Sequence, residues 1–296
     1  MKQKALFIFN PKSGTGDFTF PELKEKVLAN LDGFELVDFE TTGENDPQKI
    51  RDQINQLTPD LILVGGGDGT VKLVAENLEK SIPMAILPLG SANGLAKCLG
   101  IDLLEDGLDA LRKMMAISMD AIEINGELCL HLADFGFNAK LIEGFEQQEG
   151  RGMLGYIKSS FSQLFITEKY PFQIQTNDRT WELETRMLLI ANGDRFGTGA
   201  VINPNGKLDD GKFEIVTLNI ETFDDLLDVS KSLISGDMGE GEGIQSWSLT
   251  SCKIINKAGV KFQIDGELKG NPDEIEVAIH PGRFQFITRM ESTHTT

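Results

Sequence analysis

The run of residues 65–70, Gly-Gly-Gly-Asp-Gly-Thr, could bind a phosphate chain through its backbone. It directly follows the apolar segment 61–64 and opens a stretch with helical periodicity. Glycines allow backbone N–H groups to converge on an anion, and a helix N-terminus adds a partial positive charge. The run is not a Walker loop, because no Gly-Lys-Ser/Thr follows it. It is not the dinucleotide fingerprint either, since Thr70 stands where the third glycine belongs.

Two further loops have the same small and hydroxyl-bearing character. Residues 10–16, Asn-Pro-Lys-Ser-Gly-Thr-Gly, follow the first apolar run, and residues 88–94, Pro-Leu-Gly-Ser-Ala-Asn-Gly, follow the fourth. Ligands of open α/β sheets bind at the carboxyl ends of the strands, so we expect all three loops to converge on one crevice. A tight turn without a ligand would explain one such loop, but it explains three converging loops poorly.

The first part of the chain alternates strand and helix patterns, which would place these loops at one sheet edge. Strands are expected at residues 5–9, 34–39, 61–64 and 84–87. Helices are expected at residues 21–31, 47–57, 70–78 and from Ser91 onward. Repeated strand–helix units predict a doubly wound, mainly parallel α/β domain over residues 1–119.

The pattern changes near Asp120 to one dominated by strands. Asn125-Gly126 is a strong hairpin signal. Further strands are expected at residues 172–176, 180–183, 187–191, 213–218, 260–264 and 274–279, and helices at 153–165 and 222–234. This predicts a largely antiparallel β-sandwich over residues 120–281, with residues 282–296 packing back on the first domain and a nucleotide cleft between the domains. The helix at 153–165 could line a lipid entrance or simply face the protein core, and the second interpretation is favoured.

Composition excludes several classes of protein. Lys plus Arg total 28 against 46 for Asp plus Glu, a formal charge of −18, so sequence-independent binding of nucleic acid is not expected. The cysteines Cys98, Cys129 and Cys252 are scattered and form no C-x-x-C pair, which argues against a disulfide framework or a zinc site. No apolar run approaches the ~20 residues of a membrane-spanning helix. We therefore expect a cytoplasmic protein.

Five segments in order resemble one known family. They are residues 10–14, 66–70 and 88–93, then Asn192-Gly193 with the run 204–213, and finally Asp265-Gly266-Glu267. Together they resemble the diacylglycerol kinase catalytic-domain family, which includes bacterial lipid kinases and the sphingosine and ceramide kinases. The NAD kinases are more distant relatives through the Gly-Gly-Asp-Gly-Thr signature.

The resemblance implies an ATP- and Mg²⁺-dependent kinase of a lipid hydroxyl. It assigns nucleotide binding to Asn10, Pro11, Lys12, Ser13, Gly14, Thr41, Gly66, Gly67, Asp68, Gly69, Thr70, Ser91 and Asn93. The catalytic residues that it implies are Asp68 and either Asp265 or Glu267 as the base, and the sequence does not choose between the last two.

The resemblance also implies two magnesium sites. Asp68, Asp120 and Asp265 would hold the catalytic Mg²⁺, partly through water. Asp210, with backbone oxygens of Lys207 and Lys212, would hold a structural Mg²⁺. Asp120 and Asp210 both stand in contexts that favour turns, where an aspartate often has no role beyond the turn.

The lipid acceptor is the least determined part of the hypothesis. Diacylglycerol is the first choice, giving phosphatidic acid at a membrane surface with which the protein associates transiently. Gly94-Leu95 replaces a common Asp-Phe, and Asn138 replaces a common Asp. Because residues 91–96, Ser-Ala-Asn-Gly-Leu-Ala, resemble the sphingosine kinases, a sphingoid base is the nearest alternative. NAD ranks lower, a silent nucleotide- or lipid-binding regulator is the rival from another class, and a homodimer is left open.

Overall fold

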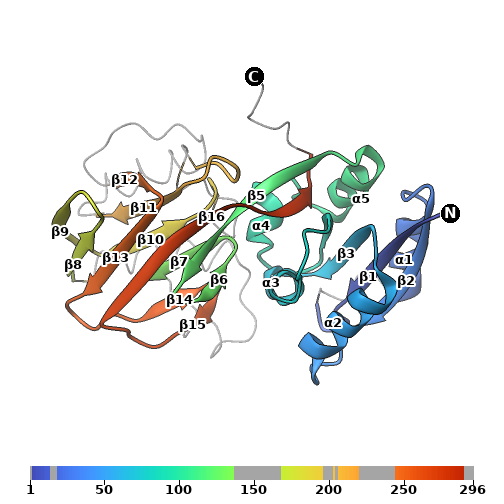
Figure 1. Cartoon of the computed structure of the whole chain (residues 1–296), viewed down its shortest axis with the longest axis horizontal. Helices are drawn as coiled ribbons and strands as arrows, with labels where there is room; N and C mark the ends of the chain where they lie inside the picture. The colour runs from blue at the N-terminus through green and yellow to red at the C-terminus, as the bar shows by residue number, and fades with distance from the viewer. Residues whose placement is uncertain are drawn as a thin grey trace. The chain divides into compact units, whose positions relative to one another are not determined.

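The computed structural model describes residues 2–13, 19–136, 168–195, 203, 206–219 and 244–289. These residues form two compact units (Figure 1). The first contains the chain up to Asp120 and again from Pro281, and the second contains the chain between Ala121 and His280. Strands β5 (Ala116–Ile124) and β16 (Glu274–Ile287) carry the chain from one unit to the other.

The first unit has a parallel sheet with the strand order β2-β1-β3-β4, in which the end of β16 pairs in parallel with β4 through Phe286 and Met84. These strands are β1 (Gln3–Phe9), β2 (Phe34–Glu40), β3 (Leu61–Gly66) and β4 (Met84–Pro88). Every residue of β3 is buried, as its continuous apolar run predicts for a central parallel strand. The expected parallel α/β domain is confirmed.

Five helices follow or connect these strands within the described residues of the first unit. They are α1 (Phe20–Leu28), α2 (Asp46–Leu57), α3 (Asp68–Glu76), α4 (Gly94–Cys98) and α5 (Leu104–Lys113). α4 begins at Gly94 and not at Ser91, because Asn93 adopts a left-handed conformation with φ 53° in front of it. α5 was not expected, since Gly107 interrupts its pattern; a Cβ there would lie 2.7 Å from the carbonyl oxygen of Ile86 on β4.

The second unit is a sandwich of two largely antiparallel sheets. One contains β16, β13 (Ser251–Asn256), β8 (Tyr170–Gln175) and β9 (Thr180–Thr185), with the hairpin of β5 and β6 (Glu127–Cys129) beside β16. The other has the order β12-β11-β10-β7-β14-β15, formed by Ile244–Leu249, Phe213–Leu218, Met187–Ala191, Leu132–Phe135, Phe262–Ile264 and Glu267–Leu268. This confirms the predicted β-sandwich.

Aromatic rings fill the space between the two sheets. The ring of Phe135 on β7 lies 4.4 Å from that of Phe262 on β14 and 5.3 Å from that of Phe172 on β8, measured between centroids. All three side chains are almost completely buried. The core therefore joins both sheets and gives the strands of the second unit a fixed register.

Local signals had mixed success in the second unit. Asn125 and Gly126 have φ of 52° and 82° and form the expected hairpin turn. β12 and β13 were not expected, because Ser and Gln occupy the exposed positions of β12 and weaken its pattern. The helices expected at 153–165 and 222–234, and Asn138, lie outside the described residues. None of the described helices is long and apolar enough to cross a membrane.

Candidate active site

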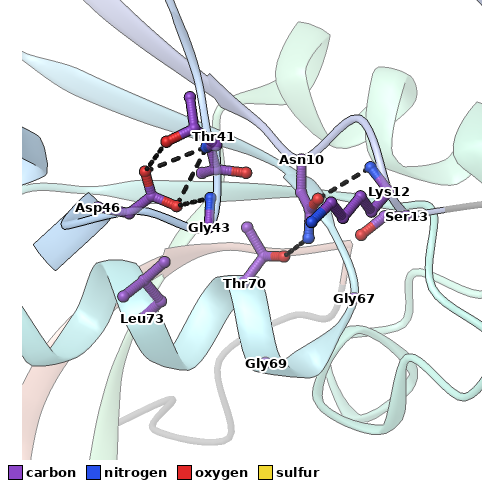
Figure 2. Close-up of a pocket in the computed structure, with 11 residues that line it drawn as sticks. Asn10, Lys12, Ser13, Thr41, Gly43, Asp46, Gly67, Gly69, Thr70 and Leu73 are labelled. Atoms are coloured by element: carbon purple, nitrogen blue, oxygen red, sulfur yellow. Dashed lines mark hydrogen bonds between the residues drawn. The ribbon is translucent and has the colours of Figure 1, made fainter.

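A cavity of about 370 Å³ lies in the first unit, where β1, β2 and β3 end (Figure 2). Seven of the predicted nucleotide-binding residues line it: Asn10, Lys12, Ser13, Thr41, Gly67, Gly69 and Thr70. Thr42, Gly43, Asp46 and Leu73 complete its lining. The structure thus brings together three segments that are far apart in sequence.

Asn10 joins the first of these segments to the third. Its backbone N–H donates to the carbonyl of Gly65 (2.9 Å), and its Oδ1 accepts the N–H of Lys12 (3.0 Å). Its Nδ2 donates to Oγ1 of Thr70 (3.1 Å), as Figure 2 shows. One side chain therefore shapes the loop after β1 and holds it against the first turn of α3.

The N-terminus of α3 is suited to an anion. α3 starts directly after Gly67, and no side chain caps it. Since the first N–H groups of a helix have no partner within the helix, they can donate to a ligand, and the helix dipole favours negative charge there. Lys12 adds a cation to the same cavity. This arrangement matches the phosphate-binding chemistry expected from the sequence.

Two glycines of the second and third loops, Gly66 and Gly90, also allow close packing, which was not expected. A Cβ on Gly90 would lie 2.5 Å from Cα of Gly67, and one on Gly66 would lie 2.5 Å from Oγ1 of Thr70. These loops therefore touch backbone against backbone. Gly66 and Pro11 do not line the cavity, and Gly14 lies outside the described residues.

Asn93 and Ser91 belong to the third loop and also lie outside the cavity lining. Nδ2 of Asn93 donates to the carbonyl of Gly90 (2.7 Å). Its Oδ1 is buried and has no hydrogen-bond partner in the described part of the chain. A buried acceptor without a hydrogen-bond partner lowers the stability of the fold by about 1–3 kcal/mol. A bound group with hydroxyl or amino hydrogens, such as a nucleotide, would supply the missing donor.

Asp68 connects the second loop to α4. Its carboxylate accepts the backbone N–H groups of Gly94 (2.9 Å) and Leu95 (3.1 Å), the first residues of α4. A carboxylate at a helix N-terminus stabilises that helix. Each oxygen accepts one of these bonds, which leaves lone pairs for water on a magnesium ion. The side chain is therefore an anchor whose remaining acceptor capacity fits the metal role.

Asp46 is the charged residue of the cavity that sequence reasoning missed. Its Oδ2 accepts the N–H of Gly43 (2.7 Å), and its Oδ1 accepts the N–H and the Oγ–H of Thr42 (3.1 Å each). Burial alone would raise the pKa of Asp46, but these hydrogen bonds outweigh it and hold the pKa below its usual value. The sequence signal that could have identified Asp46 was its position before Pro47 at the start of a predicted helix. Leu73 forms an apolar wall of the cavity, and no sequence signal pointed to it.

In the second unit, Asp265 and Gly266 form the two-residue turn between β14 and β15, with φ of 48° and 88°. Oδ1 of Asp265 accepts the N–H groups of His131 (3.0 Å) and Leu132 (3.2 Å), and Oδ2 accepts that of Leu130 (3.0 Å). Asp265 thus fastens the turn to the segment that leads into β7.

Glu267 differs from Asp265 in being exposed. Its Oε2 pairs with Nζ of Lys269 at 2.9 Å, and its side chain is 60% accessible. Burial tends to lower the pKa of Lys269, but hydrogen bonds to Glu127 and Glu267 raise it overall. Of the two candidate bases, Glu267 has the carboxylate that a second molecule can reach.

The remaining expected metal ligands are Asp120 and Asp210, with the backbone of Lys207 and Lys212. Asp120 is inside β5, is 2% exposed and accepts the N–H of Gly282 (2.7 Å), so the expectation of a turn was wrong there. Asp210 lies in a turn, and its Oδ1 accepts the N–H of Lys212 (3.0 Å), whereas Lys207 is exposed. No group of three acidic, histidine or cysteine side chains able to hold a metal occurs among the described residues.

Two family models match the chain. Residues 4–124 match the diacylglycerol kinase catalytic domain, and residues 134–288 match the YegS C-terminal NAD kinase beta sandwich-like domain. The chain belongs to the family of lipid kinases that combines these two domains. Its kinase class uses ATP.

Individual relatives agree with this assignment. A Pseudomonas aeruginosa protein named "Probable lipid kinase YegS-like" is 28% identical over 292 residues, 95% of this chain and 93% of that protein. A diacylglycerol kinase structure from Bacillus anthracis has a TM-score of 0.72 at 20% identity, covering 97% of each chain. An NAD kinase from Archaeoglobus fulgidus in complex with ATP has a TM-score of 0.52 at 12% identity, covering 97% of this chain and 94% of that one. These two structures share the fold of this chain.

Proposed function

We propose that this lipid kinase transfers the γ-phosphoryl group of ATP to the hydroxyl of diacylglycerol and forms phosphatidic acid. The observation that carries the proposal is the cavity in which Asn10, Lys12, Thr41 and the uncapped start of α3 come together. Phosphoryl transfer depends mainly on positioning and on neutralising charge, and these groups supply both. Diacylglycerol is the acceptor named for the first of the two matched domains.

In the proposed reaction, the N–H groups at the start of α3 and Lys12 hold the phosphates. Glu267 accepts the proton of the lipid hydroxyl as the hydroxyl oxygen attacks the γ-phosphorus, and the bond from that phosphorus to the bridging oxygen breaks to release ADP. We assign Asp265 to holding the turn, because both of its oxygens already accept backbone hydrogen bonds.

Magnesium fits the carboxylates on which the sequence hypothesis depends. When bound, Mg²⁺ would neutralise charge on the phosphates. We propose that Asp68, Asp120 and Asp265 hold the catalytic ion, partly through water, and that Asp210 with backbone oxygens of Lys207 and Lys212 holds a structural one. Carboxylate, carbonyl and water oxygens are the ligands that Mg²⁺ prefers.

Diacylglycerol resides in bilayers, so we propose that the protein works at a membrane surface by transient association, on the face where ATP is present. A sphingoid base is the second candidate acceptor. The segment 91–96 favours it, because this segment lacks the Asp-Phe common in bacterial diacylglycerol kinases.

An assay with radiolabelled ATP, Mg²⁺ and mixed micelles tests the proposal, with diacylglycerol, a sphingoid base and NAD offered separately. Label in phosphatidic acid supports it, and the Glu267→Gln variant should then lose nearly all of that label. Label only in the sphingoid base or only in NAD would replace the acceptor. No transfer to any of them, with ATP still bound, would favour a silent regulator.

A further inference from the structure

The side chain of Gln263 connects β7 to the turn that precedes Glu267. Gln263 lies on β14, directly opposite Asp134 of β7, and is 1% exposed. Its Nε2 donates to Oδ2 of Asp134, and its Oε1 accepts the backbone N–H of Gly266 (2.7 Å). β7, β14 and β15 are neighbours in one sheet of the second unit (Figure 1).

The two hydrogen bonds fix the orientation of this amide. A backbone N–H can only donate, so the atom that faces Gly266 must be the amide oxygen. The amide nitrogen then faces Asp134, whose carboxylate accepts. Gln263 is therefore satisfied at both ends, and the three groups form a chain from the middle of the sheet to the turn.

The turn needs such support because its backbone is unusual. Asp265 is a non-glycine residue in the left-handed region, a conformation that most residues with a Cβ rarely adopt. The carboxylate of Asp265 fastens one side of the turn to residues 130–132. The other side of the turn is held through the Gly266 N–H, on the peptide that joins Asp265 to Gly266, which donates to Gln263.

We propose that Gln263 is a positioning residue of the kinase reaction, which sets the place of Glu267 by holding the Gly266 N–H against the buried carboxylate of Asp134. This inference rests on the proposed role of Glu267 as the base. Asp265 and Gln263 then fix the turn from its two ends. A base displaced by about 1 Å can lose up to about 100-fold in rate, whereas the nucleotide, bound in the first unit, is unaffected.

The test is the substitution Gln263→Met, which keeps the length of the side chain and removes both hydrogen bonds. It should lower kcat for diacylglycerol at least tenfold and leave KM for ATP within twofold. A general loss of stability would not separate kcat from KM in this way.

A matched control uses another buried amide of the same unit. Asn256 ends β13 in the other sheet, is 3% exposed, and its Nδ2 donates to the carbonyls of Val260 (2.9 Å) and Pro272 (2.8 Å). Asn256→Ala should lower stability without changing kcat. If Gln263→Met folds and keeps the wild-type kcat, the inference is overturned.

Failure of the inference can be told apart from failure of the proposed function. In the latter case the wild type itself transfers no phosphate to a lipid. Amide hydrogen exchange then still reports on the contact: the Gly266 amide should be protected in wild type and exchange at least tenfold faster in Gln263→Met. An amide that exchanges equally fast in both proteins would exclude the contact.

Discussion

At the scale of single residues, Gly69 differs from the other glycines of its loop. At Gly66 and Gly90, neighbouring atoms lie only 2.5 Å from where a Cβ would be, and at Gly67 the nearest atom lies at 3.1 Å. Gly69 lies in the first turn of α3 with open space where its Cβ would be, and it faces the cavity. Glycine inside a helix is less stable than alanine by about 1 kcal/mol. Packing therefore does not explain this glycine, whereas close approach of a phosphate, as in the proposed function, would.

Gly69→Ala should separate stability from binding. The free protein should become slightly more stable, with the melting temperature raised by about 2–4 °C at most, because alanine favours the helix. Affinity for Mg²⁺-ATP should fall about tenfold or more, since the methyl group occupies the space needed by the phosphates. Calorimetry measures both quantities, and Glu25→Ala on the exposed face of α1 is the control. Unchanged ATP affinity would show that Gly69 makes no close approach.

Asp46→Asn should lower the stability of the folded protein, and the loss should depend on pH. The pKa of Asp46 is lower in the folded than in the unfolded protein, so its contribution is present above the ordinary value of 3.8 and disappears as the pH falls through the folded value. At pH 7 the variant should lose about 1–3 kcal/mol of unfolding free energy, because one set of hydrogen bonds to Thr42 and Gly43 is lost.

Urea denaturation at pH 7 and near pH 3 checks this expectation. Wild type and Asp46→Asn should differ at neutral pH and converge in acid. Asp52→Asn, on an exposed position of the same helix, should behave like wild type at both values. A difference that stays constant between the two pH values would mean that the charge of Asp46 contributes nothing.

Sequence reasoning identified the carboxylates of Asp68 and Asp265 but not their contacts. Asp68 was recognised from its motif, yet its backbone partners at Gly94 and Leu95 lie on another loop. Asp265 is fastened to residues more than 130 positions earlier. Such contacts form only when the strands have assembled, so residue type and spacing cannot reveal them. The proposal of Glu267 as the base likewise depends on its exposure, which the sequence does not reveal.

At the scale of elements, the parallel sheet determines where the loops meet. Apolar runs predicted β1 to β4, and their parallel order places the loops after β1, β2 and β3 around one cavity. Two elements that were not predicted, α5 and β12, contain residues that disturb the expected sequence pattern. These are Gly107 inside α5 and the exposed Ser and Gln residues of β12. In these elements, tertiary contacts stabilise what the local pattern does not indicate.

The contact between the second and third loops gives a prediction at this scale. In Gly90→Ala, the new Cβ would lie 2.5 Å from Cα of Gly67 and 2.7 Å from Oδ1 of Asn93. Backbone cannot move aside as a flexible side chain can, so we expect a loss of about 1–3 kcal/mol in stability. Kinase activity should fall with it, because Gly67 precedes α3. Thermal unfolding and turnover test this, and a variant with wild-type values of both would contradict the close packing of the loops.

At the scale of the whole molecule, the charge of −18 conflicts with a substrate in an anionic membrane. On average, such a chain is repelled by anionic lipid surfaces, and the repulsion acts over a Debye length of about 10 Å at 0.1 M salt. The proposed membrane association therefore requires local apolar or basic groups, or conditions that screen the charge. The long-range field thus opposes docking and cannot steer the enzyme to its substrate.

Turnover of diacylglycerol in vesicles should accordingly depend on both salt and lipid charge. In vesicles rich in phosphatidylserine, raising the salt from about 20 to 200 mM should increase the rate, because the Debye length shortens from roughly 20 Å to below 10 Å. In phosphatidylcholine vesicles the same change should have little effect, and detergent micelles without charge provide the control for salt effects on chemistry. A rate on anionic vesicles that falls with salt would mean that a basic patch attracts the protein against its net charge, so that local electrostatics, and not total charge, governs docking.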